Sequence, residues 1–101
     1  MNDSMHQTQR AVRRFRLGTL CGTPGALDAL RTAGMDIADL LQRHVTGDWG
    51  DVDAEDRETN EQAVRHGGQI VSSYMLSTQV KVWVISEAER SVTTLLLPEE
   101  Y

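Results

Sequence analysis

Residues 69–97, QIVSSYMLSTQVKVWVISEAERSVTTLLL, form the stretch that decides the fold. Valine, isoleucine, threonine and aromatic residues dominate three runs in it, at 69–76, 80–86 and 91–97, and these residue types favour strands. Short connections of three and four residues separate the runs. Such connections force antiparallel hairpins, because a parallel return needs about a dozen residues or more. The stretch therefore predicts a three-stranded antiparallel meander.

Upstream of the meander, the sequence predicts one short strand and three helices. The strand is expected over residues 15–20. Each helix begins at a threonine or aspartate that suits an N-cap and ends near a glycine, with the limits Thr23 to Gly34, Asp36 to Gly47 and Asp53 to His66. The chain is thus expected to be a single small α+β domain over residues 14–101, behind a mobile, polar and basic leader over residues 1–13.

Length, charge and composition exclude several classes of protein. A chain of 101 residues is long enough for one self-supporting core, and it carries a formal net charge of −5. The single cysteine excludes an internal disulfide, no apolar run reaches the ~18 residues of a membrane span, and the N-terminus lacks the apolar centre of a secretory signal. We therefore expect a cytoplasmic protein with no membrane partner. Cys21 and Trp83 are expected to pack in the core.

An acidic segment at residues 48–61 is the first candidate site, with seven carboxylates against one arginine. A dense carboxylate array on a small domain can occupy a protein surface that binds nucleic acid, and long-range attraction speeds its arrival. The alternative is a merely solvated helix face. The indole in this segment either folds back over the core or stands exposed as an anchor. The predicted binding residues are Asp48, Trp49, Asp51, Asp53, Glu55, Asp56, Glu58 and Glu61.

A second candidate site combines His44 with Arg90, Thr94 and Tyr74 from the predicted strands. Histidine moves protons near neutral pH and arginine stabilises developing phosphorane charge, a pairing that suits metal-independent phosphodiester cleavage. The structural alternative is that His44 stabilises the C-terminus of its helix and that threonine and tyrosine are ordinary strand residues. The histidine and the nearby aspartates match no known metal-ligand spacing, so neither a metal nor a cofactor is expected.

Several segments resemble a family of small bacterial proteins found on plasmids, prophages and other mobile elements, some of them labelled as restriction-system subunits. The resemblance covers residues 17–101 and is carried by residues 47–51, 70–74, 82–94 and 97–101. The chain departs from it at residues 77–79, where a glycine-containing turn is expected. The resemblance implies an accessory protein that binds a host or defence-system protein, for instance as an anti-defence inhibitor.

The order of helices and strands also resembles, more faintly, the fold of barnase, EndoU and RelE-type ribonucleases. This resemblance implies catalytic positions at His44, Arg90 and Thr94, with Tyr74 close by, and RNA as the substrate. A nuclease must hold a polyanion, and a chain with a net charge of −5 repels one unless its cations converge. Charge therefore favours the protein-binding module over the ribonuclease.

Overall fold

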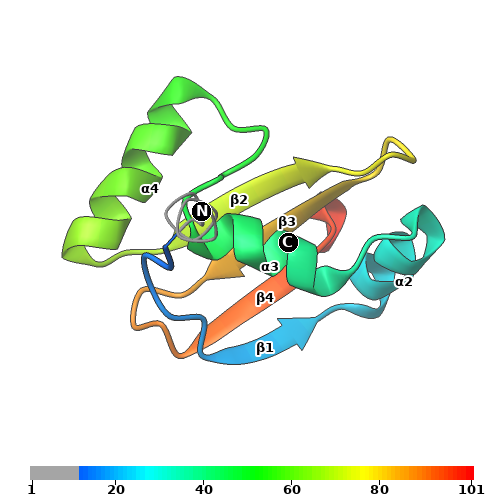
Figure 1. Cartoon of the computed structure of the whole chain (residues 1–101), viewed down its shortest axis with the longest axis horizontal. Coiled ribbons are helices and arrows are strands. Elements are labelled where there is room, and N and C mark those ends of the chain that lie inside the picture. Colours follow the sequence, from blue (N-terminus) through cyan, green and yellow to red (C-terminus); the bar gives the residue numbers. More distant parts are fainter. Residues whose placement is uncertain (1–11) are drawn as a thin grey trace, which may run out of the picture.

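The computed structural model describes residues 12–101, so most of the predicted leader lies outside the described residues. These residues form a mixed α+β domain with a four-stranded sheet (Figure 1). The elements in chain order are β1 (Thr19–Gly22), α2 (Pro24–Ala33), α3 (Ile37–Val45), α4 (Ala54–His66), β2 (Ile70–Met75), β3 (Lys81–Ser86), β4 (Val92–Leu96) and the 3-10 turn η1 (Pro98–Glu100). The α+β class and the order of elements predicted from the sequence are confirmed.

The sheet has the strand order β1-β4-β3-β2. Strands β2, β3 and β4 form the two antiparallel hairpins that the short connections predicted. Strand β1 pairs parallel to β4, so the sheet is mixed. The predicted limits of this strand, residues 15–20, are wrong: its pairing begins with the bond from the Thr19 amide to the Ser91 carbonyl at 2.9 Å. Phe15 and Leu17 pack inward ahead of the strand instead.

The predicted N-caps at Thr23 and Asp36 and the predicted start of the third helix at Asp53 are confirmed. The side chains of Thr23, Asp36 and Asp53 accept hydrogen bonds from backbone amides in the first turn of α2, α3 and α4. Each bond satisfies one of the amides that a helix N-terminus leaves without a partner. Gly34 closes α2 in the left-handed conformation, with φ of 67°. These local signals place the ends of the helices that flank the sheet.

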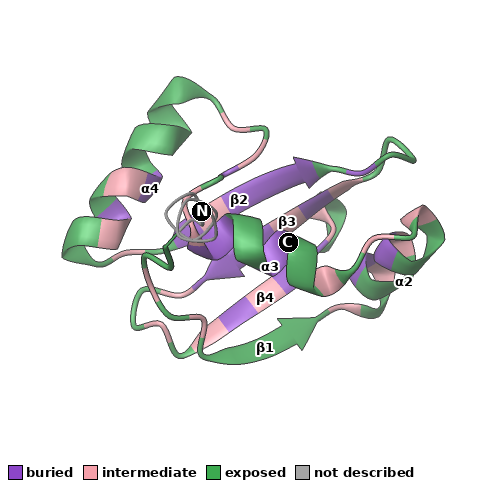
Figure 2. Ribbon diagram, viewed as in Figure 1, coloured by how far each residue is buried: buried purple, intermediate pink, exposed green. Residues whose placement is uncertain are grey.

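The main core lies between one face of the sheet and the pair α2 and α3. In Figure 1, α3 crosses in front of the sheet, while the C-terminal η1 lies behind it. Buried residues of the core come from both layers and include Leu30, Leu40, Tyr74, Val84 and Leu95. Figure 2 shows the contrast with β1, which is exposed along its whole length, and with α4, which is mostly exposed. The opposite face of the sheet is therefore less covered than the face under α3.

Helix α4 packs against the edge of the sheet formed by β2, and a polar side chain makes the junction. The Asn60 amide donates to the Val71 carbonyl at 2.9 Å and accepts from the Val71 amide at 3.1 Å, as a neighbouring strand would. Two further bonds, from the Ser73 amide to Trp49 and from the Asp51 amide to Ser73, continue this pairing. The edge of β2 is thus occupied by α4 and the preceding loop.

Two residues expected in the core lie elsewhere. Side chains alternate across a strand, so Val82 and Val84 face the core while Trp83 faces away from it. Trp83 is half-buried on the opposite face, where its ring meets Tyr101 edge-on at 5.7 Å. Cys21 is exposed, because it lies on the edge strand β1 and points to the same open face. The prediction of core packing is wrong for both residues.

Candidate functional site

Five carboxylates of the predicted binding segment are exposed. They lie close together in the sequence, on the loop before α4 and on its first turns. We call this set the acidic surface. It consists of Asp51, Asp53, Glu55, Asp56 and Glu58. Glu55 and Asp56 lie in the first turn of α4, where the helix dipole stabilises negative charge. Lys81 approaches Asp51 at 3.9 Å, and within residues 12–101 the other four carboxylates make no ion pair.

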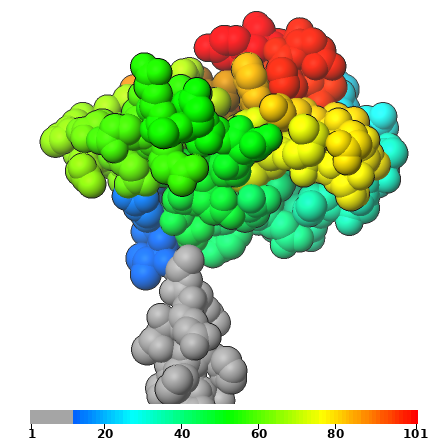
Figure 3. All heavy atoms as spheres, turned by 90° about the horizontal axis from the view of Figure 1, so that it is seen from above, coloured from blue at the N-terminus to red at the C-terminus, as the bar shows by residue number. Residues whose placement is uncertain are grey.

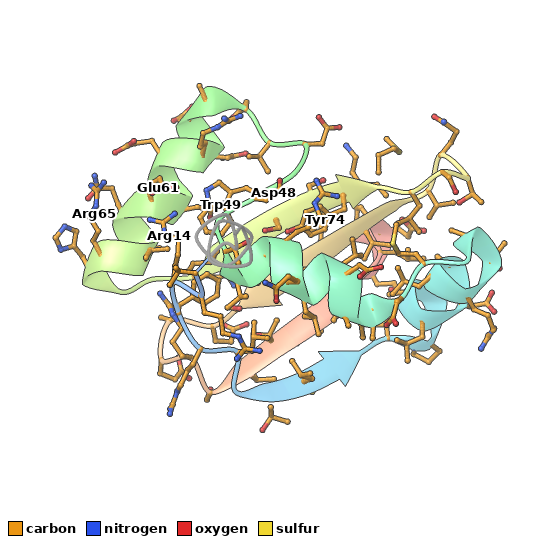
Figure 4. All side chains as sticks on the ribbon, viewed as in Figure 1. Arg14, Asp48, Trp49, Glu61, Arg65 and Tyr74 are labelled. Atoms are coloured by element: carbon orange, nitrogen blue, oxygen red, sulfur yellow. The ribbon has the colours of Figure 1, made fainter. Side chains whose placement is uncertain are left out.

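The other three predicted binding residues are engaged within the fold. Arg43 donates to both carboxylate oxygens of Asp48, at 2.7 and 3.3 Å. Glu61 accepts two bonds from Arg14, at 2.8 and 3.0 Å, and a third from the Trp49 indole at 3.1 Å. The hydrogen bonds from Arg14 hold the pKa of Glu61 at about 2. Figure 4 shows Arg14, Trp49 and Glu61 gathered beside α4.

Trp49 is folded back over the core and is 4% exposed. Its ring stacks on Phe15 at 6.2 Å and meets the imidazole of His44 edge-on at 6.1 Å. Gly50 makes this position possible, because its φ is +75° and a Cβ there would lie 2.2 Å from the Ser73 carbonyl oxygen. Of the two alternatives that the sequence left open, the structure has the folded one. A buried indole is not available as an exposed anchor, so we no longer count Trp49 among the predicted binding residues.

His44 is fully buried between α3 and the sheet. Its Nδ1 lies 2.6 Å from the Ser72 hydroxyl and its Nε2 lies 2.9 Å from the Ser86 hydroxyl. Burial lowers the pKa of the imidazole to about 3, and the charge of Arg90 acts in the same direction. The ring is therefore neutral at physiological pH and is enclosed by protein groups.

The hydroxyls around His44 determine which ring nitrogen carries the proton. Thr93 donates its hydroxyl proton to the Leu17 carbonyl at 2.7 Å. The Ser86 hydroxyl, 2.6 Å from that of Thr93, must then donate to it, and so can only accept from the ring. It follows that Nε2 of His44 bears the proton and Nδ1 accepts from Ser72. Both nitrogens are bonded inside the fold, so the role of His44 is structural. The expected stabilisation of the helix C-terminus is nevertheless wrong, because the ring is neutral and its bonds go to serines of the sheet.

The structure does not bring the other nuclease candidates together with His44 at an accessible surface. Arg90 donates to the backbone carbonyls of its own turn and of α4 and the loop that follows it. Tyr74 is buried and donates to the Asp48 carbonyl at 2.7 Å. Thr94 lies on the sheet face opposite to His44, because its neighbour Thr93 faces the imidazole network. The sequence could not reveal this separation, since it depends on which face each strand buries.

A groove on the open face of the sheet was not anticipated from the sequence. It has a volume of about 510 Å³ and runs between α4, the loop before it and the C-terminal residues. In Figure 3, α4 (green) and the C-terminal segment (red) stand on either side of sheet atoms. Its floor and rim include Val71, Ser73, Trp83, Ile85 and Tyr101, together with Asp51, Asp53, Asp56 and Lys81. The alternation of Trp83 and Ile85 with the core valines was the sequence signal for this second face.

Residues 12–101 contain no group of three or more histidine, cysteine, aspartate or glutamate side chains placed to hold a metal ion. In the same range, every helix is too short or too polar to span a bilayer.

Comparison of the chain with protein-family models, with curated proteins and with solved structures finds no significant match.

Proposed function

We propose that this protein is a small acidic binding module that docks through its acidic surface onto a basic surface of another protein, of the kind that holds nucleic acid. The observation that carries the proposal is the segregation of charge: five exposed carboxylates occupy eight consecutive positions, 51–58, with one arginine among them. Carboxylates already paired inside the fold, at Asp48 and Glu61, do not compete for this role. Complementary charge of this density speeds encounter and suppresses wrong partners.

The resemblance of residues 17–101 to mobile-element proteins supports a host or defence-system protein in the cytoplasm as the partner. A defence protein that acts on DNA or RNA must present a basic surface to the phosphate backbone. An acidic module bound there would exclude the nucleic acid and inhibit the defence. The proposal is thus an anti-defence role for an accessory protein of a plasmid or phage.

The experiment compares two variants with equal net charge. The first replaces four carboxylates of the acidic surface: Asp53→Asn, Glu55→Gln, Asp56→Asn and Glu58→Gln. The matched control replaces four carboxylates elsewhere: Asp39→Asn, Glu87→Gln, Glu89→Gln and Glu99→Gln. Both changes take the formal charge from −5 to about −1. Each immobilised variant and the wild type are used to capture proteins from host lysate, and the bound proteins are challenged with duplex DNA.

We expect wild type and control to retain a partner that DNA displaces, and the first variant to lose it. Each interfacial charge pair contributes between one and several kcal/mol, so the loss of four carboxylates should weaken binding by at least about a hundredfold. Equal capture by the two variants would mean that net charge, rather than the acidic surface, attracts the partner. A partner that DNA cannot displace would rule out the nucleic-acid-binding surface.

The ribonuclease alternative lacks comparable support in the described residues. Its proton-transfer group, His44, is fully buried and keeps its proton on the nitrogen that bonds to Ser86. Its arginine is bonded to four backbone carbonyls. Incubation of the purified protein with labelled total RNA in the presence of a chelator, alongside His44→Ala, tests it directly. Cleavage that the variant abolishes would restore this alternative.

A further inference from the structure

The groove on the open sheet face carries the features of a binding site for a cation. Its lining side chains include three carboxylates, from Asp51, Asp53 and Asp56, and one ammonium, from Lys81. Lys81 approaches Asp51. Within residues 12–101, Asp53 and Asp56 at the N-terminus of α4 make no ion pair. Apolar groups of the lining come from Val71, Ile85 and the planar ring of Trp83. A ligand that combines positive charge with a flat apolar surface fits both parts.

A buried hydroxyl on the floor of this groove has no partner. Ser73 is 5% exposed, and among the described residues its Oγ makes no hydrogen bond. Buried polar groups in folded proteins are nearly always bonded, so an exception calls for an explanation. Ser73 lies on the same face of β2 as Val71 and lines the groove. Because Ser73 lines the groove, its unpaired hydroxyl is a candidate acceptor for a donor bound there.

Two places elsewhere in the fold combine an aromatic ring and a carboxylate, and each binds an arginine. Arg43 lies over the ring of Tyr74 at 4.5 Å while it bonds to Asp48, and Arg14 lies over the ring of Trp49 at 6.0 Å while it bonds to Glu61. In both places a guanidinium stacks on an aromatic ring and pairs with a carboxylate. The groove offers the same two partners, an aromatic pair (Trp83 and Tyr101) and carboxylates.

We propose that the groove receives an arginine side chain of the partner protein, with its guanidinium on the indole of Trp83 and its N–H groups shared between Ser73 and the aspartates at the start of α4. The planar guanidinium stacks on rings and has five donors, whereas the ammonium of lysine is compact and more strongly hydrated. Arginine is also enriched among the residues that dominate interface energies. The inference rests on the proposed function for the nature of the partner.

Peptide titration tests the site without the partner. The probe is acetyl-Gly-Arg-Gly-amide, compared with its lysine and citrulline counterparts, added to ¹⁵N-labelled protein. The chain has two tryptophans, so two indole N–H signals report the outcome. We expect a saturable shift of the Trp83 indole and the Ser73 amide with the arginine peptide, and little shift of the Trp49 indole, which is bonded to Glu61. Binding of the citrulline peptide should be weaker by about tenfold or more, because it lacks the charge.

Variants connect the binding to the named residues. Asp53→Ser with Asp56→Asn keeps an N-cap for α4 and should abolish the shifts, whereas Asp39→Asn with Glu89→Gln should leave them unchanged. Ser73→Ala should weaken binding of the arginine peptide without lowering thermal stability, because the hydroxyl has no partner to lose. Equal binding of arginine and citrulline peptides, or of arginine and lysine peptides, would contradict the inference, as would shifts that spread over α4 without saturation.

Partner capture separates this inference from the proposed function. Ser73→Ala retains every carboxylate of the acidic surface. If it captures the partner as wild type does while the four-carboxylate variant fails, the docking function stands and the arginine site is wrong. If both variants capture the partner, the docking function itself is wrong. Weaker capture by Ser73→Ala together with loss of capture by the four-carboxylate variant, with folding intact by circular dichroism, supports both proposals.

Discussion

The imidazole of His44 makes stability depend on pH at the scale of a single residue. In the folded chain its pKa is lowered to about 3, chiefly by burial. In the unfolded chain an imidazole titrates near 6.5, at about its ordinary value. Between these pKa values the unfolded state binds a proton and the folded state does not. The free energy of unfolding therefore rises with pH in this window. The contribution of His44 to stability is lost as the pH falls from about 6.5 toward 3.

We expect this residue alone to lower the free energy of unfolding by about 2 kcal/mol between pH 7 and pH 5. Urea unfolding at pH 7, 6 and 5 measures the effect, and His44→Gln, which does not titrate, should have a flatter profile whatever its absolute stability. Glu61 does not interfere. Its pKa is lowered to about 2, so its contribution is present above about 4.5 and is lost only below that pH. The same slope in both proteins would show that His44 is not the source.

At the scale of elements, the turn between β2 and β3 holds a residue with a strained backbone. In this turn, residues 77–79, Gln79 adopts the left-handed conformation with φ of 70°. The turn is closed by bonds from the Gln79 amide to Leu76 and from the Leu76 amide to Val80, at 2.9 and 2.8 Å. A glutamine is strained in this conformation, whereas a glycine is not.

Gln79→Gly should raise the free energy of unfolding by about 0.5–1 kcal/mol, because the relief of strain exceeds the added flexibility of the unfolded chain. Arg90 is the matched control, with φ of 59° in the next turn. Its guanidinium bonds to the carbonyls of Gly68 and Ala63, so Arg90→Gly should lower stability despite the same relief of the backbone. Denaturant unfolding of both variants checks the contrast, and a destabilised Gln79→Gly would contradict it.

Helix α4 illustrates how a weak apolar pattern is compensated. The sequence predicts a thin apolar face, and the structure buries two of its residues, Asn60 and Ala63. The paired bonds of Asn60 with the backbone of Val71 add polar attachment to β2. The carboxylates of the first turns remain free to face outward. The polar sequence of α4 therefore explains both its weak apolar face and its share of the acidic surface.

Charge acts at the scale of the whole molecule. The net charge of −5 and its concentration at residues 51–58 produce a field that reaches beyond contact distance. Salt shortens that reach, to about 10 Å at 0.1 M and about 3 Å at 1 M. Under the proposed function, the partner is therefore attracted before the surfaces touch.

For the partner recovered by capture, the association rate constant should fall about tenfold or more between 50 mM and 500 mM NaCl. The dissociation rate constant should change less, because it depends on contacts that salt screens weakly once they are buried. Surface-immobilised binding kinetics at several salt concentrations measure both constants. An association rate that does not respond to salt would exclude electrostatic attraction as the basis of docking.

The sequence by itself determined the local features of this protein. Helix caps at Thr23, Asp36 and Asp53, and connections of three or four residues between the last strands, depend on neighbours along the chain, so their hydrogen bonds are readable from spacing. The exposed acidic segment was readable for the same reason, because its carboxylates have few apolar neighbours to bury them.

The tertiary structure alone decided the features that join distant segments. Pairing of β1 with β4, the hydroxyl of Thr93 on the carbonyl of Leu17, and the burial of Trp49 against Phe15 connect residues up to 76 positions apart. The same packing enclosed His44 and turned Trp83 outward onto the groove. Which face of a strand is buried depends on the layer that packs against it, and a period of two residues carries no information about that layer.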